Sequence, residues 1–344
     1  MRTSFQICIL ALVALFIGVA APRVNAQCTS DLNADHSVTA QDLAIMLAFW
    51  GPTTTFAAAD INQDQIVNAQ DLAMLLAMWG PCAAPSWGIP IEWAPNPAVV
   101  TDANFRQRMI ETGLPWRVRD SGTGIEMLLV PPGIFMMGCS TGDTECSGDE
   151  SLSHQVTLTQ AFYLGRTEVT QAQWLATIGS NPSYLCVAPA NCSDNPVDSV
   201  TWDMIQIFCT QTGMRLPTEA EWEYACRGGT LASRYGPINN IAWWGWNQPG
   251  GNTGPITHAV ATKQANTLGF YDMIGNLFEW CEDWLGPYST DNVTNPMGST
   301  TGQFRVLRGG AFYASVDGCR ASFRYGDEPN DSANASGFRV ARNP

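Results

Sequence analysis

An apolar run from Ile7 to Ala21 follows a short basic start and is the first hydrophobic feature of the chain. A run of this length matches the core of a secretory signal peptide and is short for a membrane-spanning helix. Val24 and Ala26 place small residues at the −3 and −1 positions of a cleavage site. The pattern predicts a signal peptide over 1–26 and export to the periplasm, cell surface or medium, with no membrane span after cleavage. An uncleaved anchor is the alternative.

The second pattern is a tandem repeat with a period of 29 residues. Residues 31–43 read DLNADHSVTAQDL and residues 60–72 read DINQDQIVNAQDL, and each copy continues into an apolar stretch that ends in Trp-Gly-Pro. Repetition at a fixed period indicates a duplicated structural unit. Each copy predicts a polar loop followed by an apolar helix. Val38 and Val67 are expected in a short strand that pairs the two loops.

Oxygen-bearing side chains recur at positions 1, 3, 5, 9 and 12 of both loops. A hard cation such as calcium takes about 6–8 oxygen ligands, and this spacing turns them toward one centre. The predicted ligands are Asp31, Asn33, Asp35, Thr39 and Asp42, then Asp60, Asn62, Asp64, Asn68 and Asp71. The sixth position, usually glycine, holds His36 and Gln65, so we expect backbone strain and weakened affinity. A helical hairpin with acidic turns and no metal is the alternative.

The two loop–helix units, over residues 28–82, resemble a dockerin, which lacks the entering helix of a full EF-hand. Aspartate at the twelfth position is compatible with that resemblance. Dockerins bind cohesin domains, so the resemblance implies a cohesin-like protein partner.

The stretch after the repeats predicts a linker. Residues 83–100 are rich in proline and small residues, and 101–112 predict a short helix capped by Thr101 or Asp102. We therefore expect a linker with a short helix over 83–124. Farther along, alternation over 156–159 predicts a strand, and Thr218 followed by Glu221 predicts a capped helix start.

Charge and composition narrow the partners. The chain has 17 Lys and Arg against 31 Asp and Glu, a formal charge of −14, and no basic patch. This argues against a nucleic-acid partner, because phosphate binding needs clustered cations. With 31 Gly and 21 Pro, we expect many turns and long loops rather than long helices.

Cysteine usage agrees with export. Ten of the 11 cysteines follow the signal segment, and an even number in an oxidising compartment predicts disulfides. Spacing favours Cys28–Cys82, Cys139–Cys146 and Cys186–Cys192. For the remaining four, spacing does not determine the pairing, and Cys209–Cys226 with Cys281–Cys319 is one arrangement.

From residue 125 to 344 a series of segments follows a family-specific order. They include HQVTLTQAFYLGRTEVTQAQW (154–174), MRLPTEAEWEYACRGG (214–229), LGFYDMIGNLFEWCEDW (268–284) and RVLRGGAF (305–312). This part resembles the formylglycine-generating enzyme, or sulfatase-modifying factor, family. The resemblance implies an α+β fold, C-type-lectin-like, with much irregular structure.

The resemblance also implies a calcium site in the segment YDMIGNLFE. Its ligands would be the side chains of Asp272 and Glu279 with the main-chain oxygens of Gly275 and Leu277, a donor set that suits calcium. The alternative is that the two carboxylates only cap turns.

The family's oxidase activity converts a sulfatase cysteine to formylglycine, with copper(I) held by two cysteines five residues apart. In RGGAFYASVDGC the second cysteine matches Cys319, but the first falls on Ala314 and the family's serine falls on Ala311. Soft copper(I) favours thiolate ligands, so a lone thiol leaves the site incomplete. Cys319 remains the one candidate catalytic residue, and copper is implied only if oxidase activity is retained.

Three hypotheses follow. The domain is a non-oxidase relative that binds a protein, peptide or glycan, for which Trp243, Trp244 and Trp246 form a candidate surface. Alternatively, it is an oxidase that acts on a sulfatase. A third class, iron-dependent oxidases that form carbon–sulfur bonds, places its histidine ligands in a helical domain with no counterpart here. We favour the first hypothesis, because function resides in the site rather than in the fold.

Overall fold

The computed structural model describes residues 30–33, 37–52, 57–62, 64–82, 84–185, 192–245, 247 and 256–344. Buried apolar side chains form two separate clusters, a small one between Val38 and Leu75 and a large one between Val100 and Ala341. The described residues therefore form two structural units, each with its own core. The predicted signal peptide lies outside the described residues.

The repeat unit contains two matched helices, α2 (Ala40–Ala48) and α3 (Ala69–Ala77), with a short 3₁₀ turn η2 (Ala57–Ala59) between them. Thr39 and Asn68 cap the helices by accepting hydrogen bonds from backbone N–H groups in the first turn. The predicted helices are thus present, and they begin directly after the ninth loop position.

The strand pairing of the repeat unit differs from the prediction. The loop strand β1 (Ser37–Val38) pairs with β4 (Gly80–Pro81), and the loop strand β3 (Ile66–Val67) pairs with β2 (Gly51–Pro52). Each loop therefore pairs with the Gly-Pro segment that ends the other repeat's helix, and the prediction that the loops pair with each other is wrong. The crosswise arrangement buries Val38 and Val67 completely in the small core.

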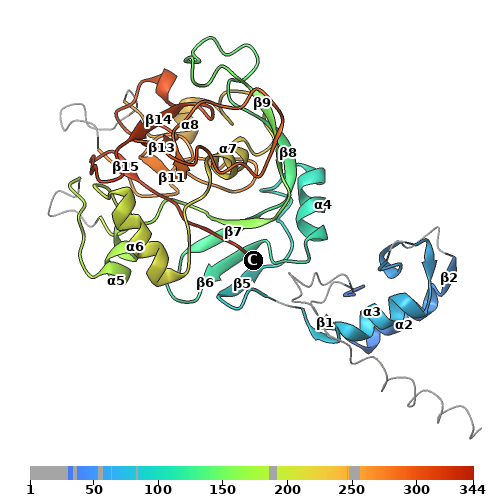
Figure 1. Ribbon diagram of the computed structural model, residues 1–344. Coiled ribbons are helices and arrows are strands. Elements are labelled where there is room, and N and C mark those ends of the chain that lie inside the picture. Colours follow the sequence, from blue (N-terminus) through green and yellow to red (C-terminus); the bar gives the residue numbers. More distant parts are fainter. Residues whose placement is uncertain are drawn as a thin grey trace, which may run out of the picture.

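The described residues of the large domain form three sheets (Figure 1). Their strand orders are β16–β10–β7–β6–β5, β14–β13–β11–β15 and β12–β9–β8. The strands are β5 (Gly88–Glu92), β6 (Arg117–Asp120), β7 (Glu126–Val130), β8 (Gly133–Met137), β9 (His154–Leu158), β10 (Phe162–Gly165), β11 (Phe278–Trp284), β12 (Val293–Thr294), β13 (Arg305–Arg308), β14 (Arg324–Asp327), β15 (Ser336–Gly337) and β16 (Ala341–Arg342). The predicted strand over 156–159 is present within β9.

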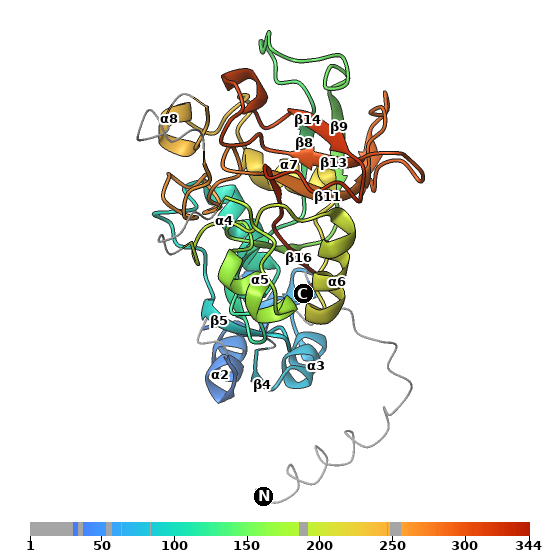
Figure 2. The ribbon, with the colours of Figure 1, turned by 90° about the vertical axis from the view of Figure 1, so that its left-hand side faces the viewer.

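Short helices cover these sheets. They are α4 (Ala103–Glu111), α5 (Gln171–Ile178), α6 (Trp202–Thr212), α7 (Glu219–Arg227), α8 (Ile238–Ile241) and the 3₁₀ turn η3 (Val316–Gly318). Figure 2 shows α5 beside α6, where the rings of Trp174 and Phe208 stack with centroids 5.5 Å apart. The mixed helix and sheet content confirms the α+β expectation.

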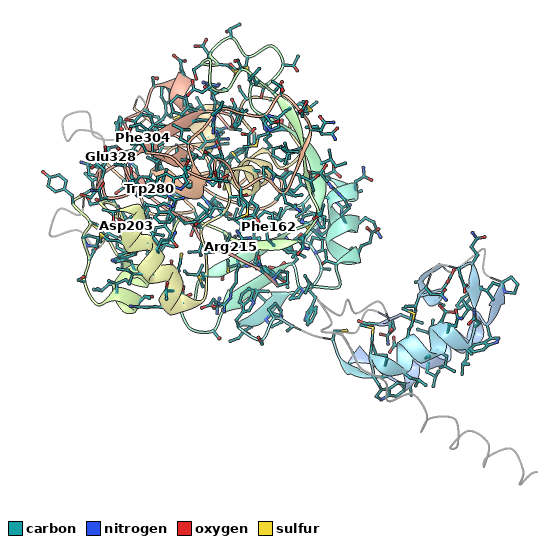
Figure 3. All side chains as sticks on the ribbon, in the orientation of Figure 1. Phe162, Asp203, Arg215, Trp280, Phe304 and Glu328 are labelled. Carbon is teal, nitrogen blue, oxygen red and sulfur yellow. A yellow bond between two sulfur atoms is a disulfide. The ribbon has the colours of Figure 1, made fainter. Side chains whose placement is uncertain are left out.

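Helix α7 occupies the centre of the domain. Thr218 and Glu221 form the predicted capping box, and the helix packs against β8, β11 and β13. Phe162 of β10 and Trp280 of β11, both labelled in Figure 3, are buried in the same core. Because α7 is buried, the charged side chains on it must find partners inside the protein.

The segment expected to be a linker is partly structural. Within 83–124, β5 and β6 pair with each other, and β6 pairs with β7 of the family-like domain. Asp102 caps α4, whose Phe105 and Met109 are buried. Proline and small residues favoured a linker, but β5 is an edge strand, where proline is tolerated because its missing N–H leaves no ladder hydrogen bond unmade.

The cysteines only partly follow the prediction. Cys139 and Cys146 form a disulfide. Cys82 and Cys192 are disulfide-bonded, while their expected partners Cys28 and Cys186 lie outside the described residues. The suggested pairs Cys209–Cys226 and Cys281–Cys319 are wrong, since all four are free and buried. They lie on separate core elements, where each packs as a small apolar side chain.

Candidate functional site

The loop that would carry the oxidase cysteines begins at Gly309 and Gly310, both of which have positive φ. A Cβ on Gly310 would lie 2.6 Å from the carbonyl oxygen of Gly318 and 3.0 Å from the sulfur of Cys319. Only glycine allows the backbone to approach this closely. The two glycines therefore allow Cys319 to pack directly against the backbone of its own loop.

Cys319 is fully buried at the end of η3. Burial raises the pKa of its thiol to about 12, so the sulfur carries a proton at neutral pH. Arg234 donates hydrogen bonds to the carbonyl oxygens of Cys319 at 2.7 Å and Val316 at 2.5 Å. The loop is thus held through its backbone, and the thiol is not activated as a nucleophile.

Ala314 and Ala311 occupy the other two family positions of this loop. Ala311 is fully buried and Ala314 is 9% exposed. Ala314 donates its N–H to the carbonyl oxygen of Ala311, and its own carbonyl accepts the N–H of Gly245. Only one sulfur, that of Cys319, lies between residues 309 and 320, so this segment does not supply the thiolate pair that copper(I) favours.

The predicted calcium segment lies in a buried charged cluster. Glu279 accepts two hydrogen bonds of 2.6 Å from the guanidinium of Arg339, and Trp222 donates its indole N–H to the same carboxylate at 2.7 Å. Arg339 and Glu279 are both at least 99% buried. Glu279 thus already has strong partners within the protein.

Asp272 differs from Glu279 because one of its oxygens is unsatisfied. Oδ2 accepts the N–H of Ala261 at 2.7 Å, whereas Oδ1 is buried and accepts no hydrogen bond from the residues that the structure describes. Burial raises the pKa of Asp272 to about 6. The residue also has a positive φ of 53°, which is uncommon for aspartate.

Glu168 completes the cluster, although it is not among the residues that the sequence predicted for this site. Its carboxylate accepts the side-chain N–H of Asn276 at 2.9 Å and the backbone N–H of Leu277 at 3.1 Å. Burial, together with the charge of Asp272, raises the pKa of Glu168 well above its usual value. Glu168 lies in GRTEVT, within the family-like segment 154–174. Because this segment is more than a hundred residues from Asp272, no local pattern connects the two carboxylates.

Gly275 and Leu277 lie between these carboxylates in the chain. Gly275 has a φ of 82°, and a Cβ there would collide with the carbonyl oxygen of Trp243. Its N–H donates to the carbonyl oxygen of Gly309 at 2.9 Å. The segment YDMIGNLFE is thereby hydrogen-bonded to the Arg-Gly-Gly segment, and the predicted main-chain ligands lie in a closely packed turn.

The acidic loops of the repeat unit bring together part of the predicted calcium set. Ligand oxygens of Asp60, Asp64 and Asp71 lie within 4.8 Å of one another. Asp60 accepts the N–H groups of Asp64 and Gln65 at 3.0 and 2.7 Å. Gln65, at the sixth position, has a φ of 71°, which is the strained backbone that the sequence predicted there.

The first loop is described only in part, because Asp35 and His36 lie outside the described residues. Asp42 is fully buried and accepts the N–H groups of Leu32 at 2.7 Å and Thr39 at 2.8 Å. Asp71 of the second loop likewise accepts the N–H groups of Asn62 at 3.1 Å and Asn68 at 2.9 Å. The twelfth position thus organises both loops.

The tryptophans of the candidate ligand surface have intramolecular partners. Trp243 stacks on His258 at 3.8 Å, and the ammonium of Lys263 lies 3.9 Å from its ring centroid. Trp244 donates its indole N–H to Asn239 at 3.0 Å. Trp246 lies outside the described residues. The two described rings therefore stabilise the domain's own loops.

In the part of the chain that the structure describes, no helix has the length and apolar character needed to cross a bilayer.

Comparisons with known proteins agree with both structural units. Residues 112–344 match the family described as sulfatase-modifying factor enzyme 1-like domain, and residues 29–78 match the dockerin type I domain. Among solved structures, Treponema denticola variable protein 1 is similar, with a TM-score of 0.57 and 28% identity over 64% of this chain and 95% of that one.

Curated relatives carry different names. The formylglycine-generating enzyme of Mus musculus is 35% identical over 281 residues, which cover 63% of this chain and 74% of the mouse protein. The serine/threonine-protein kinase pkn1 of Chlamydia pneumoniae is 32% identical over 63% of this chain, and the chain spans 38% of that protein's length. The chaperone protein LppX of Paenibacillus barcinonensis is 29% identical over 62% of this chain and 97% of its own.

The order of the motifs, the α+β architecture and the match over residues 112–344 together place this chain in the sulfatase-modifying factor, or formylglycine-generating enzyme, family, with a dockerin type I unit preceding the family domain.

Proposed function

We propose that the protein is an exported, non-oxidase member of its family. Its large domain binds a protein or peptide ligand, and its dockerin unit, loaded with calcium, attaches it to a cohesin-like partner. The observation that carries the proposal is the lone, buried and protonated thiol of Cys319 opposite an alanine at position 314.

The chemistry of the loop argues against copper catalysis. Copper(I) favours two soft thiolates, and here one position offers a methyl group while the other offers a thiol with a pKa of about 12. Relatives named as a kinase and a chaperone are consistent with a domain that has been used for more than one purpose.

The dockerin unit presents an apolar surface that supports a protein partner. Leu47 and Trp50 follow the first loop, Leu76 and Trp79 occupy the equivalent places after the second, and each side chain is about half exposed. Exposed apolar side chains in matched positions are typical of binding surfaces. A cohesin-like domain is the partner that the dockerin match suggests.

We also retain calcium at both predicted places as part of the proposal. The close carboxylates Asp60, Asp64 and Asp71 suit it in the repeats. In the large domain the unsatisfied oxygen of Asp272 favours a cation, whereas the Arg339 partner of Glu279 opposes coordination there. In the large domain, calcium would be coordinated chiefly by the side chain of Asp272 and the main-chain oxygens of Gly275 and Leu277.

An oxidase that converts a sulfatase cysteine is the second candidate. The similarity to the mouse formylglycine-generating enzyme favours it, since this is the relative with 35% identity.

An activity assay separates the two candidates. The protein without its signal segment is incubated with copper(I), oxygen and a peptide containing Cys-x-Pro-x-Arg, and the product is analysed by mass spectrometry. We expect no aldehyde, while a formylglycine-generating enzyme run in parallel converts the same peptide. Turnover to the aldehyde would refute the non-oxidase proposal.

A further inference from the structure

A cavity of about 540 Å³ opens beside the N-terminus of α7, away from the Cys319 loop. It lies between α7, the end of β11, the first residue of β9 and the loop that contains β12. A volume of this size accommodates a small organic ligand or a protruding side chain. No residue of the oxidase loop or of the predicted calcium segment lines it.

Asp283 forms the polar end of this cavity. The residue is 97% buried, and its Oδ2 accepts the backbone N–H of Glu219 at 2.8 Å. Its Oδ1 accepts no hydrogen bond from any described residue and lies beside Gly298, where a Cβ would come within 2.8 Å of it. Asp283 lines the cavity, so a ligand that enters the cavity can donate a hydrogen bond to this oxygen.

The remaining charged groups on the cavity wall are already paired. Arg324 donates to both oxygens of Glu219 at 2.6 and 2.8 Å and to the carbonyl oxygen of Gly286 at 2.9 Å. Tyr288 donates its hydroxyl to Glu219 at 3.1 Å, and His154 uses Nδ1 on the carbonyl oxygen of Leu152. Among the carboxylate and guanidinium groups on the wall, Asp283 is thus the one with an oxygen that no described residue uses.

Apolar and small polar side chains form the rest of the wall. Met137, Val293, Met297 and Trp284 line it together with Ser289, Thr294 and Ser299. Such a surface suits a methylene chain that leads to a polar head, as in the side chains of long amines.

We propose that this cavity binds a primary alkylammonium group, such as the side chain of a lysine, with the ammonium on Asp283 and the methylene stem along Met137, Val293 and Met297. One free carboxyl oxygen suits the compact ammonium rather than the planar fork of a guanidinium, which favours two oxygens at once.

Electrostatics supports a cation. Burial, together with the charge of Glu219, raises the pKa of Asp283 to about 8, so that a proton occupies the carboxyl group in the empty cavity. A bound ammonium would take the place of that proton and leave Asp283 ionised in a charge-assisted hydrogen bond.

Calorimetric titration of the whole chain tests the proposal. The probes are Nα-acetyl-lysine N-methylamide, its Nε-acetylated counterpart and the corresponding arginine derivative. We expect a dissociation constant on the order of 1 mM for the lysine derivative, which is typical of a ligand of this size. The acetylated probe should bind about tenfold more weakly or worse, because it lacks the charge. Equal binding of these two probes, tighter binding of the arginine derivative, or no saturable binding overturns the proposal.

n-Pentylamine distinguishes the source of the ammonium. It carries one ammonium on a methylene stem, as the blocked lysine does, but has no peptide backbone. Binding tighter than that of the blocked lysine identifies a free amine as the ligand, and weaker binding identifies a lysine presented by a protein.

A pair of variants localises the binding. Asp283→Asn keeps an oxygen for the N–H of Glu219 but removes the charge, and it should weaken lysine binding about tenfold or more. Glu282→Gln is the matched control, since this neighbouring carboxylate lines a different cavity. Equal effects of the two substitutions would contradict the assignment.

If Asp283→Asn fails to fold, the comparison of charged and acetylated probes on the natural protein still tests the proposal. The aldehyde assay does not depend on this cavity, so the two proposals fail separately.

Discussion

The Cβ of Ala314 lies 3.5 Å from the position that a Cβ on Gly318 would occupy. Residue 314 therefore packs against the turn that precedes Cys319. We predict that Ala314→Cys raises copper(I) affinity on the order of 100-fold, because a second thiolate completes the pair that the soft ion favours. Competition with a chromophoric copper(I) chelator measures the change.

Ala314→Ser is the control for that experiment. It adds a side-chain atom of similar size but a hard oxygen, so it should leave copper(I) affinity unchanged. If the cysteine and serine variants behave alike, the alignment of this loop with the family is incorrect.

A second single residue, Arg339, supplies the cation for a buried acidic cluster. It forms an ion pair with Glu279, and its positive charge also stabilises the ionised forms of Asp272 and Glu168. We predict that Arg339→Leu lowers the free energy of unfolding by about 3–5 kcal/mol, because uncompensated carboxylates remain in the core. Urea denaturation measures this loss.

Arg119→Ala is the comparison for Arg339, because Arg119 is 54% exposed in its ion pair with Glu126. A surface pair of this kind contributes about 1 kcal/mol or less. If Arg339→Leu also lowers the free energy of unfolding by less than about 1 kcal/mol, the repulsion between the buried carboxylates must be removed in another way, for instance by protonation.

At the scale of elements, the second acidic loop combines a good set of oxygens with a strained turn. Gln65 has a φ of 71°, which costs a non-glycine residue roughly 1 kcal/mol. We predict that Gln65→Gly tightens calcium binding by about fivefold, as measured by calorimetry on the whole chain. Gln70→Gly, the same exchange inside α3, should instead weaken the unit, because glycine destabilises a helix.

Calcium should also determine whether the repeat unit folds. Asp60, Asp64 and Asp71 present oxygens within 4.8 Å of one another, and such carboxylates repel without a cation. We predict that a chelator lowers the helical circular dichroism signal and that added calcium restores it. A spectrum insensitive to the chelator would mean that backbone hydrogen bonds alone hold the loops.

At the scale of the whole molecule, stability should depend on pH through Asp283. Its pKa is about 8 in the folded protein against an ordinary value of 3.8, so the folded state binds the extra proton between these limits. The associated stabilisation is complete below about pH 4 and is lost as pH rises toward 8, by at most about 1.4 kcal/mol per pH unit. We predict that Asp283→Asn gains stability relative to the natural protein over this window.

Denaturation midpoints at pH 5, 6, 7 and 8 provide the measurement. Asp291→Asn, on an exposed loop, controls for the loss of a charge as such. A constant difference between Asp283→Asn and the natural protein across the window would show that Asp283 is ionised throughout.

Much of the molecule could be anticipated from local signals. The 29-residue repeat predicted two helices and their loops, and Thr218 with Glu221 predicted the start of α7. These features depend on hydrogen bonds and backbone angles within a few residues, which a sequence displays directly.

Other features depended on residues far apart in the chain. The crosswise strands of the repeat unit, the inclusion of β5 in the main sheet and the free state of the four core cysteines follow from packing between distant segments. Glu168 joins Asp272, and Asp283 meets the first N–H of α7, because the fold brings these segments together. By itself, then, the sequence determined the family, the repeats and the missing cysteine at position 314. Tertiary structure alone decided which carboxylates are buried, which are paired and which face a cavity, because burial and pairing arise between segments that no local pattern connects.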